Sequence, residues 1–173
     1  MKNRRKILTM IIGSFIAGAS VSYTYANDNA SVKVCFTPGE PCTDKIVDEI
    51  SNAKSEILLQ AYSFTSDPIS NALIRAHKKG IIVKCIFDNS QKDSISPRKL
   101  RSYGITVFID KPAGIAHNKV MIIDKESVVT GSFNFTKAAQ HRNVENSIVI
   151  RDEKIAKQYH RKWHEGKELS TKM

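Results

Sequence analysis

Apolar positions along the chain change spacing several times, and each change marks a boundary between predicted elements. Short runs rich in β-branched and aromatic residues, typical of strands, occupy residues 32–36, 55–64, 81–87 and 105–109. Between these runs, apolar residues recur every three or four positions, which indicates amphipathic helices. The helices are predicted from residue 43, over residues 66–80 with Ser66 as the N-cap and Gly80 as the stop, and over residues 96–104.

The second half of the chain has a different order of elements. Three apolar runs follow each other closely, at residues 118–123, 128–130 and 144–150. A final amphipathic helix is predicted over residues 152–165, with Ile155, Tyr159 and Trp163 on one face. Alternating strands and helices followed by clustered strands predict a layered α-β-α domain of the α/β class with a mixed central sheet. The sequence contains no internal repeat.

Residues 1–26 resemble a signal peptide more than part of a fold. They begin with a cationic segment, continue with an apolar stretch over residues 7–19 and end in small residues that suit cleavage before Asn27. An uncleaved anchor is the alternative, but Gly and Ser residues interrupt the apolar stretch and weaken a spanning helix. We therefore expect a single domain over residues 27–173, periplasmic or secreted, without stable membrane association after cleavage.

The oxidising compartment that a signal peptide implies affects how the three cysteines are interpreted. Cys35 and Cys42 are close in sequence and are expected to pair more readily than to remain free thiols. Cys85 lies in an apolar run and is expected to be a small buried residue. No cysteine or histidine spacing typical of a metal site is present, so neither a metal nor another cofactor is predicted.

Net charge narrows the partner class without identifying it. Of the ten net positive charges, four lie in residues 1–26, which leaves +6 for residues 27–173. A moderately basic domain suits an anionic partner such as a nucleic acid. Basic residues recur near residues 78–79 and 98–101 and in the last helix, where solvated lysines are the alternative to phosphate contacts.

One segment, residues 116–134, concentrates the polar chemistry. His117 and Lys119 are two residues apart at the start of a buried strand, so both side chains project to one face. The next strand ends at Gly131 and Ser132, where glycine allows backbone amides to approach an anion, and Asn134 follows. This set is basic, rich in donors and short of carboxylates, which suits a phosphate group.

The spacing His117-x-Lys119-x4-Asp124-x6-Gly131-Ser132-x-Asn134 resembles the HKD motif of the phospholipase D superfamily, in particular its small periplasmic endonucleases of the Nuc type. The resemblance implies a metal-independent phosphodiesterase in which one histidine forms a phosphohistidine and a second protonates the leaving oxygen. Because this chain has one motif and no repeat, the resemblance implies a homodimer whose two His117 side chains share one active site. The expected substrate is DNA, with RNA left open.

Two carboxylates are expected to support the site, Asp124 as the same resemblance implies and Glu145 because the pocket has no other obvious group to orient His117. Asp124 lies beyond the predicted strand and on the opposite parity from His117, so it is expected to support the motif without touching phosphate. An ordinary turn aspartate is the alternative. Glu145 is a candidate acceptor for the far ring nitrogen of His117, which would fix the tautomer. A solvated charge at the start of a strand is the alternative for Glu145.

Other functions stay open at this point. A phospholipase or another phosphodiesterase of the same superfamily is the enzymatic alternative, and a membrane-anchored, noncatalytic nucleic-acid-binding protein is the alternative from another class. His141 follows the motif closely. It is either a minor substrate contact or, more commonly for such a position, an ordinary loop histidine. Phe64, Phe133 and Phe135 are either base-stacking residues or, more commonly beside strands, part of the core.

Overall fold

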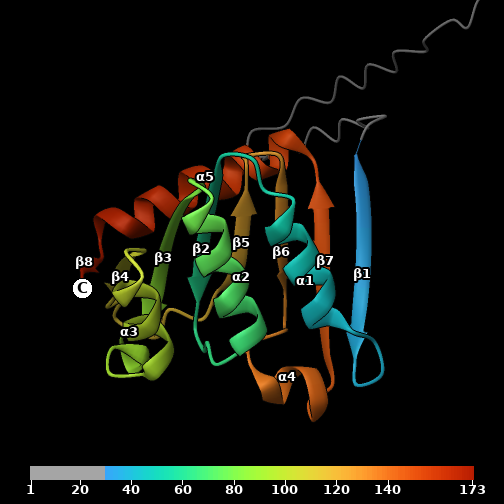
Figure 1. The fold of residues 1–173 in the computed structure, drawn as a ribbon, viewed down its shortest axis with the longest axis horizontal. Coiled ribbons are helices and arrows are strands. Elements are labelled where there is room, and N and C mark those ends of the chain that lie inside the picture. The colour runs from blue at the N-terminus through green and yellow to red at the C-terminus, as the bar shows by residue number, and fades with distance from the viewer. Residues whose placement is uncertain (1–29) are drawn as a thin grey trace, which may run out of the picture.

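The computed structural model describes residues 30–173, so the predicted signal peptide lies outside the described residues. Eight strands form one sheet in the order β1-β7-β6-β5-β2-β3-β4-β8 (Figure 1). Strands β2, β3 and β4 are parallel neighbours and the other pairs are antiparallel, which confirms the predicted mixed sheet. The strands are β1 Ser31–Thr37, β2 Glu56–Ala61, β3 Ile82–Asp88, β4 Thr106–Asp110, β5 Lys119–Ile123, β6 Ser127–Gly131, β7 Glu145–Arg151 and β8 Thr171–Lys172.

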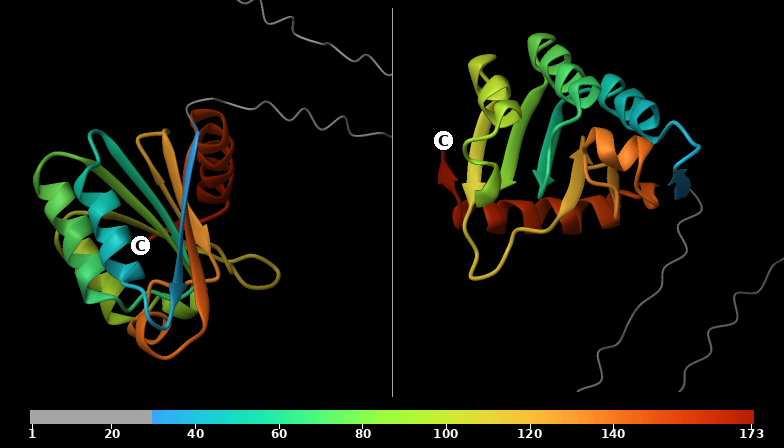
Figure 2. Two further views of the ribbon diagram at one scale, coloured as in Figure 1. Left: turned by 90° about the vertical axis from the view of Figure 1, so that its right-hand side faces the viewer. Right: turned by 90° about the horizontal axis from the view of Figure 1, so that it is seen from below.

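Helices cover both faces of this sheet and give the predicted α-β-α layers. Helices α1, α2 and α3 lie on one face and α5 crosses the other, while α4 lies at one end of the sheet (Figures 1 and 2). None of the helices described in residues 30–173 is long and apolar enough to cross a membrane. The helices are α1 Cys42–Ser51, α2 Asp67–Lys78, the short 3-10 helix η1 Asn89–Gln91, α3 Ile95–Ser102, α4 Lys137–His141 and α5 Glu153–Glu168.

Strand β2 shows why the sheet is a rigid support for its ends. Its residues are apolar on both faces: Ile57 and Leu59 face α1–α3, and Leu58 faces α5. Trp163 anchors α5 on this second face, where its indole Nε1 donates a buried hydrogen bond of 2.9 Å to the Leu59 carbonyl oxygen. Burial of each large side chain on both faces contributes about 1.5–3 kcal/mol, so the central strands are held firmly.

The structure shows how the three cysteines pair and where the three phenylalanines near the site lie. Cys35 and Cys42 form a disulfide with a Cα–Cα distance of 5.6 Å, and Cys85 is buried and free, as predicted. Phe64, Phe133 and Phe135 are at most 2% exposed, so they belong to the core and are not available to stack on bases. The disulfide ties β1 to the first residue of α1 at the end of the sheet where α4 lies.

Candidate active site

The ends of four adjacent strands, β7, β6, β5 and β2, lie together at the end of the sheet that carries the motif. Lys119 is the first residue of β5 and pairs with Ala61, the last residue of β2. On the other side of β5, the antiparallel register of β6 and β7 brings Gly131 level with Ser147. His117, Lys119, Ser132 and Glu145, separated by up to 28 residues of sequence, therefore meet at one end of the sheet because of strand order.

The backbone around His117 is fixed from several directions. The Tyr62 amide donates to the Asn118 carbonyl oxygen at 2.9 Å, and the Asn118 side-chain amide donates to Gln60 Oε1 at 3.0 Å. Lys119 Nζ donates to the His117 carbonyl oxygen at 2.7 Å. These contacts hold the His117 main chain and leave its imidazole exposed to solvent.

Asp88, which sequence reasoning missed, supports the same segment from β3. Its Oδ2 accepts a buried hydrogen bond of 2.7 Å from the amide of Ala116, the residue before His117. Its Oδ1 accepts from the Ser90 amide at 2.9 Å and so caps η1. Burial alone would raise the pKa of Asp88, but the hydrogen bonds from Ser90 and Ala116 hold it below its ordinary value.

Tyr62 is a second site residue that the sequence analysis did not identify. Its ring lies 4.6 Å from the His117 ring between centroids, and Lys119 Nζ lies 5.1 Å from the same Tyr62 centroid. Tyr62 thus packs against both the imidazole and the ammonium group, with a cation–π contact to the latter. Only the adjacency of β2 and β5 shows this role, because 55 residues separate Tyr62 from His117 in sequence.

Lys119 is a positive charge in an environment that opposes charge. The residue is only 7% exposed. Burial lowers the pKa of Lys119 below its ordinary value, and the nearby Glu145 carboxylate offsets part of that shift. The site therefore contains a desolvated ammonium group, whose attraction for an incoming anion is stronger than it would be in water.

Ser132 and Gly131 take positions that refine their predicted roles. Ser132 Oγ donates to Glu145 Oε2 at 2.6 Å and accepts from the Asn146 amide at 3.0 Å, so the hydroxyl proton is engaged in this structure. Gly131 has φ of +140°, and a Cβ there would clash with the Asn146 carbonyl oxygen. Glycine at this position is thus required by the close approach of β7, which differs from the expected role of exposing amides to an anion.

Asn134 lies at the same end of the sheet, and one atom of its side chain lacks a hydrogen-bond partner. Its side-chain Oδ1 is buried and has no hydrogen-bond partner among the described residues. A buried acceptor without a partner costs about 1–3 kcal/mol, which is typical of sites that complete their bonding with a ligand. The prediction that Asn134 belongs to the phosphate pocket remains a prediction, because the unsatisfied Oδ1 is an acceptor whereas the oxygens of a phosphate require donors.

The predicted contact between Glu145 and His117 is not made within the described chain. The Glu145 carboxylate accepts from Ser132 at Oε2 and from the Asn143 side-chain amide at Oε1, at 2.6 and 2.9 Å. The physical reason is local: Asn143 and Ser132 flank the start of β7 and donate to both carboxylate oxygens. Glu145 therefore links Ser132 to β7 and contributes negative charge near Lys119.

Asp124 lies away from the other motif residues and has a structural role. Asp124 is five positions after Lys119 along β5, which corresponds to about 16 Å at 3.3 Å per residue. Asp124 accepts hydrogen bonds from the amides of Lys54, Ser55 and Glu56 and from the Ser55 hydroxyl, at 2.8–3.0 Å. It joins the β5–β6 turn to the start of β2, so within this chain it supports the motif and does not face the phosphate pocket.

Taken together, the residues at this sheet end supply one exposed imidazole, one desolvated ammonium, a hydroxyl and an amide. The imidazole can act as a nucleophile or as a proton carrier, and the Lys119 ammonium can bind the oxygens of a phosphate. The Ser132 hydroxyl can donate to a phosphate only after it releases Glu145, and Asn134 can do so only through its side-chain N–H groups. Within residues 30–173, no three His, Cys, Asp or Glu side chains cluster closely enough to hold a metal ion.

Comparisons with known proteins point to one protein family. The family model described as "Cardiolipin synthase, PLD-like domain" matches residues 46–165. The Phospholipase D of Rickettsia prowazekii is 42% identical over 160 residues, covering 90% of this chain and 78% of the relative. A Mitochondrial cardiolipin hydrolase of Chlamydomonas reinhardtii is 34% identical over 113 residues, covering 64% of this chain and 51% of the relative.

Solved structures give the same result for the fold. Nuc from Salmonella typhimurium, described as a phospholipase D family member, superposes with a TM-score of 0.78 at 34% identity, covering 84% of this chain and 99% of Nuc. NucT from Helicobacter pylori also has a TM-score of 0.78, at 23% identity, over 84% of this chain and 100% of NucT. From the motif geometry, the family model and these relatives, the chain belongs to the phospholipase D superfamily.

Proposed function

We propose that this protein is a phosphodiesterase that cleaves DNA, with RNA as a further substrate, at an active site shared by two subunits. The observation that carries the proposal is the exposed His117 imidazole held beside the desolvated Lys119 ammonium at one end of the sheet. The net charge of +6 on residues 27–173 favours a polyanionic substrate.

The reaction proposed for His117 and Lys119 proceeds in two steps without a cofactor. A neutral His117 attacks phosphorus, forming an N–P bond while the P–O bond to the leaving group breaks, and a protonated second histidine gives its proton to the leaving oxygen. Water then attacks the phosphohistidine and loses a proton to the second histidine, which breaks the N–P bond. Lys119 offsets the negative charge of the five-coordinate phosphorus in both steps.

The second histidine comes from a second copy of the chain in this proposal. One chain supplies one His117, and its other described histidines lie outside the motif. In a symmetric dimer the two His117 side chains are equivalent, and the mechanism needs them to share one proton, with one imidazole neutral and the other protonated. A bell-shaped dependence of rate on pH follows from that sharing.

Exposed apolar residues around the site favour the dimer. Val144, directly before Glu145, is 89% exposed, and Ile115, two residues before His117, is 59% exposed. Phe36 is 57% exposed and pairs with Asn146, while Val32 and Val34 continue the same face of β1. Large exposed apolar side chains beside a polar site are typical of an interface, and a second copy would bury them together with the two half-sites.

The experiment that tests the catalytic proposal is a cleavage assay in EDTA on plasmid DNA, RNA and phosphatidylcholine. Wild-type protein is expected to cleave nucleic acid in EDTA, and His117→Ala is expected to lose that activity. Activity that disappears in EDTA and returns with Mg²⁺ or Zn²⁺, or that survives His117→Ala, would overturn the mechanism.

A phospholipase is the second candidate, favoured by the Rickettsia relatives named Phospholipase D at 42–47% identity. The pocket residues recognise a phosphodiester and not its substituents, so the same machinery suits both substrates. Hydrolysis of phosphatidylcholine without cleavage of DNA or RNA in the same assay would replace the nuclease proposal with this one.

A further inference from the structure

A cavity of about 450 Å³ lies next to the site, between the amino-terminal ends of α1 and α2 and the short helix α4. Figure 1 shows these three helix segments together at the end of the sheet where α4 lies. Its volume is within the range of about 300–1,000 Å³ that small-molecule sites occupy. None of the motif residues lines it, so the cavity is distinct from the pocket around His117.

The walls of this cavity are direct continuations of the active-site segments. One wall follows Tyr62 along the β2–α2 connection, and another follows Asn134 into α4. The Thr65 and Ser66 amides both donate to the Phe135 carbonyl oxygen, at 2.9 and 3.0 Å, which joins the two walls. A ligand that extends from the His117 pocket along these two segments would therefore reach the cavity.

The cavity is built before any ligand arrives. The side chain of Gln140 on α4 bridges to the start of α1: its Oε1 accepts from the Thr43 amide at 2.7 Å and its Nε2 donates to the Glu40 carbonyl oxygen at 2.8 Å. Thr37 adds a buried hydrogen bond of 2.8 Å from its hydroxyl to the Ala139 carbonyl oxygen. With the Cys35–Cys42 disulfide at the base of α1, these contacts fix the walls relative to each other.

Two hydroxyl groups on largely buried residues line the cavity without protein partners. Thr43 is 6% exposed and Ser66 is 4% exposed, and both belong to the lining. Ser66 occupies the N-cap position of α2 yet makes no capping hydrogen bond there. Within residues 30–173, neither hydroxyl has a hydrogen-bond partner, so both are available to a ligand.

Charges of both signs face the same space. Lys137 and His141 are exposed on α4, and neither forms an ion pair within residues 30–173. Asp44 and Asp67 lie across the cavity in the first turns of α1 and α2, where Asp67 is 3.4 Å from Lys99 Nζ. Pro41 and Pro68 add apolar surface. The two carboxylates would repel a simple anion. A nucleotide unit suits the cavity better, because it presents a phosphate to the basic side chains, hydroxyl or N–H donors to the carboxylates and an apolar ring face to the prolines.

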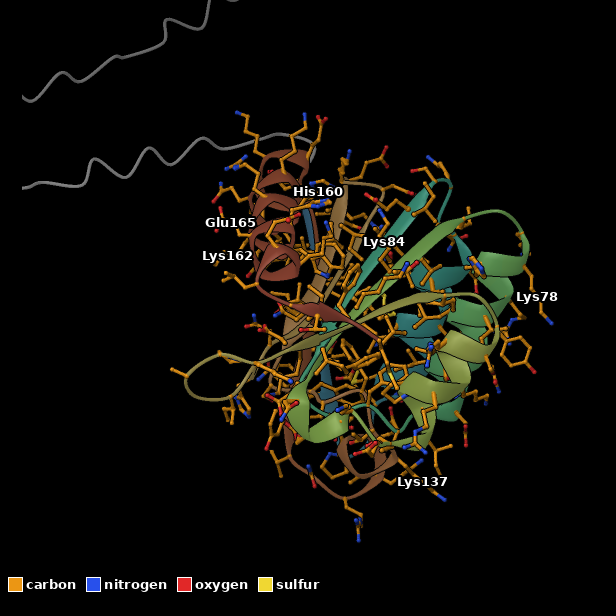
Figure 3. All side chains as sticks on the ribbon, turned by 90° about the vertical axis from the view of Figure 1, so that its left-hand side faces the viewer. Lys78, Lys84, Lys137, His160, Lys162 and Glu165 are labelled. Carbon is orange, nitrogen blue, oxygen red and sulfur yellow. A yellow bond between two sulfur atoms is a disulfide. The ribbon has the colours of Figure 1, made fainter. Side chains whose placement is uncertain are left out.

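We propose that this cavity binds the nucleotide adjoining the cleaved phosphodiester, with Lys137 and His141 at its phosphate and Asp44 and Asp67 at its base or sugar donors. The proposal rests on the proposed nuclease function. It gives His141 the substrate contact that the sequence left as one of two alternatives. It also gives a phosphate contact to Lys137, which no sequence pattern indicated. Figure 3 shows Lys137 at the lower end of the molecule, away from Lys78 and Lys162.

The test compares two substrates that share a phosphodiester and differ in their surroundings. Bis(4-nitrophenyl) phosphate carries no nucleotide, whereas a ten-residue thymidine oligonucleotide is expected to place one in the cavity. For Lys137→Gln/His141→Gln, the ratio of kcat/KM for the oligonucleotide to that for bis(4-nitrophenyl) phosphate is expected to fall at least about tenfold, as loss of about 1.4 kcal/mol of binding requires. Lys54→Gln, an exposed lysine beside Asp124 at the end of the sheet opposite to His117, is the control and should leave the ratio unchanged.

Binding provides a second readout that does not depend on turnover. On a His117→Ala background, the double variant should weaken oligonucleotide binding and reduce the slope of log Kd against log salt concentration by about one per lost phosphate contact. An unchanged ratio together with an unchanged salt slope would overturn the cavity assignment. Wild-type protein that cleaves neither DNA nor RNA but hydrolyses phosphatidylcholine would overturn the nuclease proposal instead, so the two failures are distinguishable.

Discussion

At the scale of single residues, Lys119 shows how a site can oppose the stability of its own fold. Its folded-state pKa lies below that of the unfolded chain because burial penalises the ammonium. Between the two pKa values the unfolded state binds more protons, so the free energy of unfolding rises with pH through that alkaline window. At neutral pH the fold carries the cost of the desolvated charge.

Replacing Lys119 with methionine should therefore separate stability from activity. We expect Lys119→Met to raise the melting temperature at pH 7 and to lower cleavage by about 10²–10³-fold, because the charge on the five-coordinate phosphorus loses its partner. Thermal unfolding at pH 7 and in the alkaline range should show the stability gap to wild type narrowing as pH rises. A variant that is less stable than wild type at pH 7 would contradict this account.

Asp88 holds the backbone of the segment before His117, so we expect it to affect activity indirectly and not by contact with a substrate. Asp88→Asn keeps the shape but removes the charge from the hydrogen bond to Ala116, so the segment before His117 is held less firmly. We expect a loss of about 1–3 kcal/mol in the free energy of unfolding at pH 7 and a fall in kcat larger than any change in KM.

The pH dependence identifies the cause of the Asp88 effect. The pKa of Asp88 is lowered in the fold, so its contribution is complete above the unfolded value and is lost as pH falls through the folded value. The stability difference between Asp88→Asn and wild type should thus disappear in acid. Asp93→Asn, which alters only an exposed ion pair with Arg98, serves as the control and should behave as wild type.

At the scale of elements, Asp124 joins two strands at the end of the sheet opposite to His117. Although burial raises the pKa of Asp124, its bonds to the Lys54, Ser55 and Glu56 segment hold it below the ordinary value. We expect Asp124→Asn to lower the free energy of unfolding by about 1–3 kcal/mol at neutral pH, with a difference that shrinks as pH falls through the folded pKa. Chemical denaturation at pH 7 and in the acid range measures this.

The same variant distinguishes a structural role from a catalytic one. At temperatures where both proteins are folded, Asp124→Asn should retain kcat within about twofold of wild type, because the carboxylate is about 16 Å along β5 from Lys119. A large loss of kcat with an unchanged denaturation midpoint would show instead that Asp124 acts in the reaction.

The elements with strong periodicity could be predicted from sequence, and those without it could not. The apolar runs and caps correctly indicated the central strands, the helices α1, α2, α3 and α5 and the stop at Gly80, which has φ of +92°. Helix α4 was missed because five residues are too few to show a helical period. The short elements η1 and β8 were missed for the same reason.

Some site residues could be predicted from a short stretch of sequence, and others come to the site only through the order of strands in the sheet. His117, Lys119, Ser132 and Asn134 form one motif, so their spacing alone indicated phosphate chemistry. Tyr62 and Asp88 reach the site only because β2 lies beside β5 and the chain leaving β4 passes the end of β3. No pattern within a short window carries that information, since it depends on the order of strands in the sheet.

At the scale of the whole molecule, the apolar surface beside the site should decide the oligomeric state. We expect Val144→Asp to shift the solution mass from dimer to monomer and to lower cleavage in parallel, because a charge at the centre of an interface is costly. Light scattering after size-exclusion chromatography measures the mass. Leu169→Asp, at an equally exposed apolar position after α5, is the control and should remain dimeric and active. A dimeric, active Val144→Asp would place the interface elsewhere.

Subunit mixing tests whether one active site truly needs two copies of His117. When wild-type and His117→Ala subunits exchange freely, only dimers with two wild-type subunits keep both histidines, so activity should fall as the square of the wild-type fraction. An equal mixture would then retain about one quarter of the activity, whereas independent sites would retain about one half. His117→Ala combined with Val144→Asp cannot pair in this scheme, so adding it should leave the activity of the wild-type protein unchanged. A linear fall with His117→Ala would mean that each subunit carries a complete site, and the second proton carrier would then have to come from the same chain.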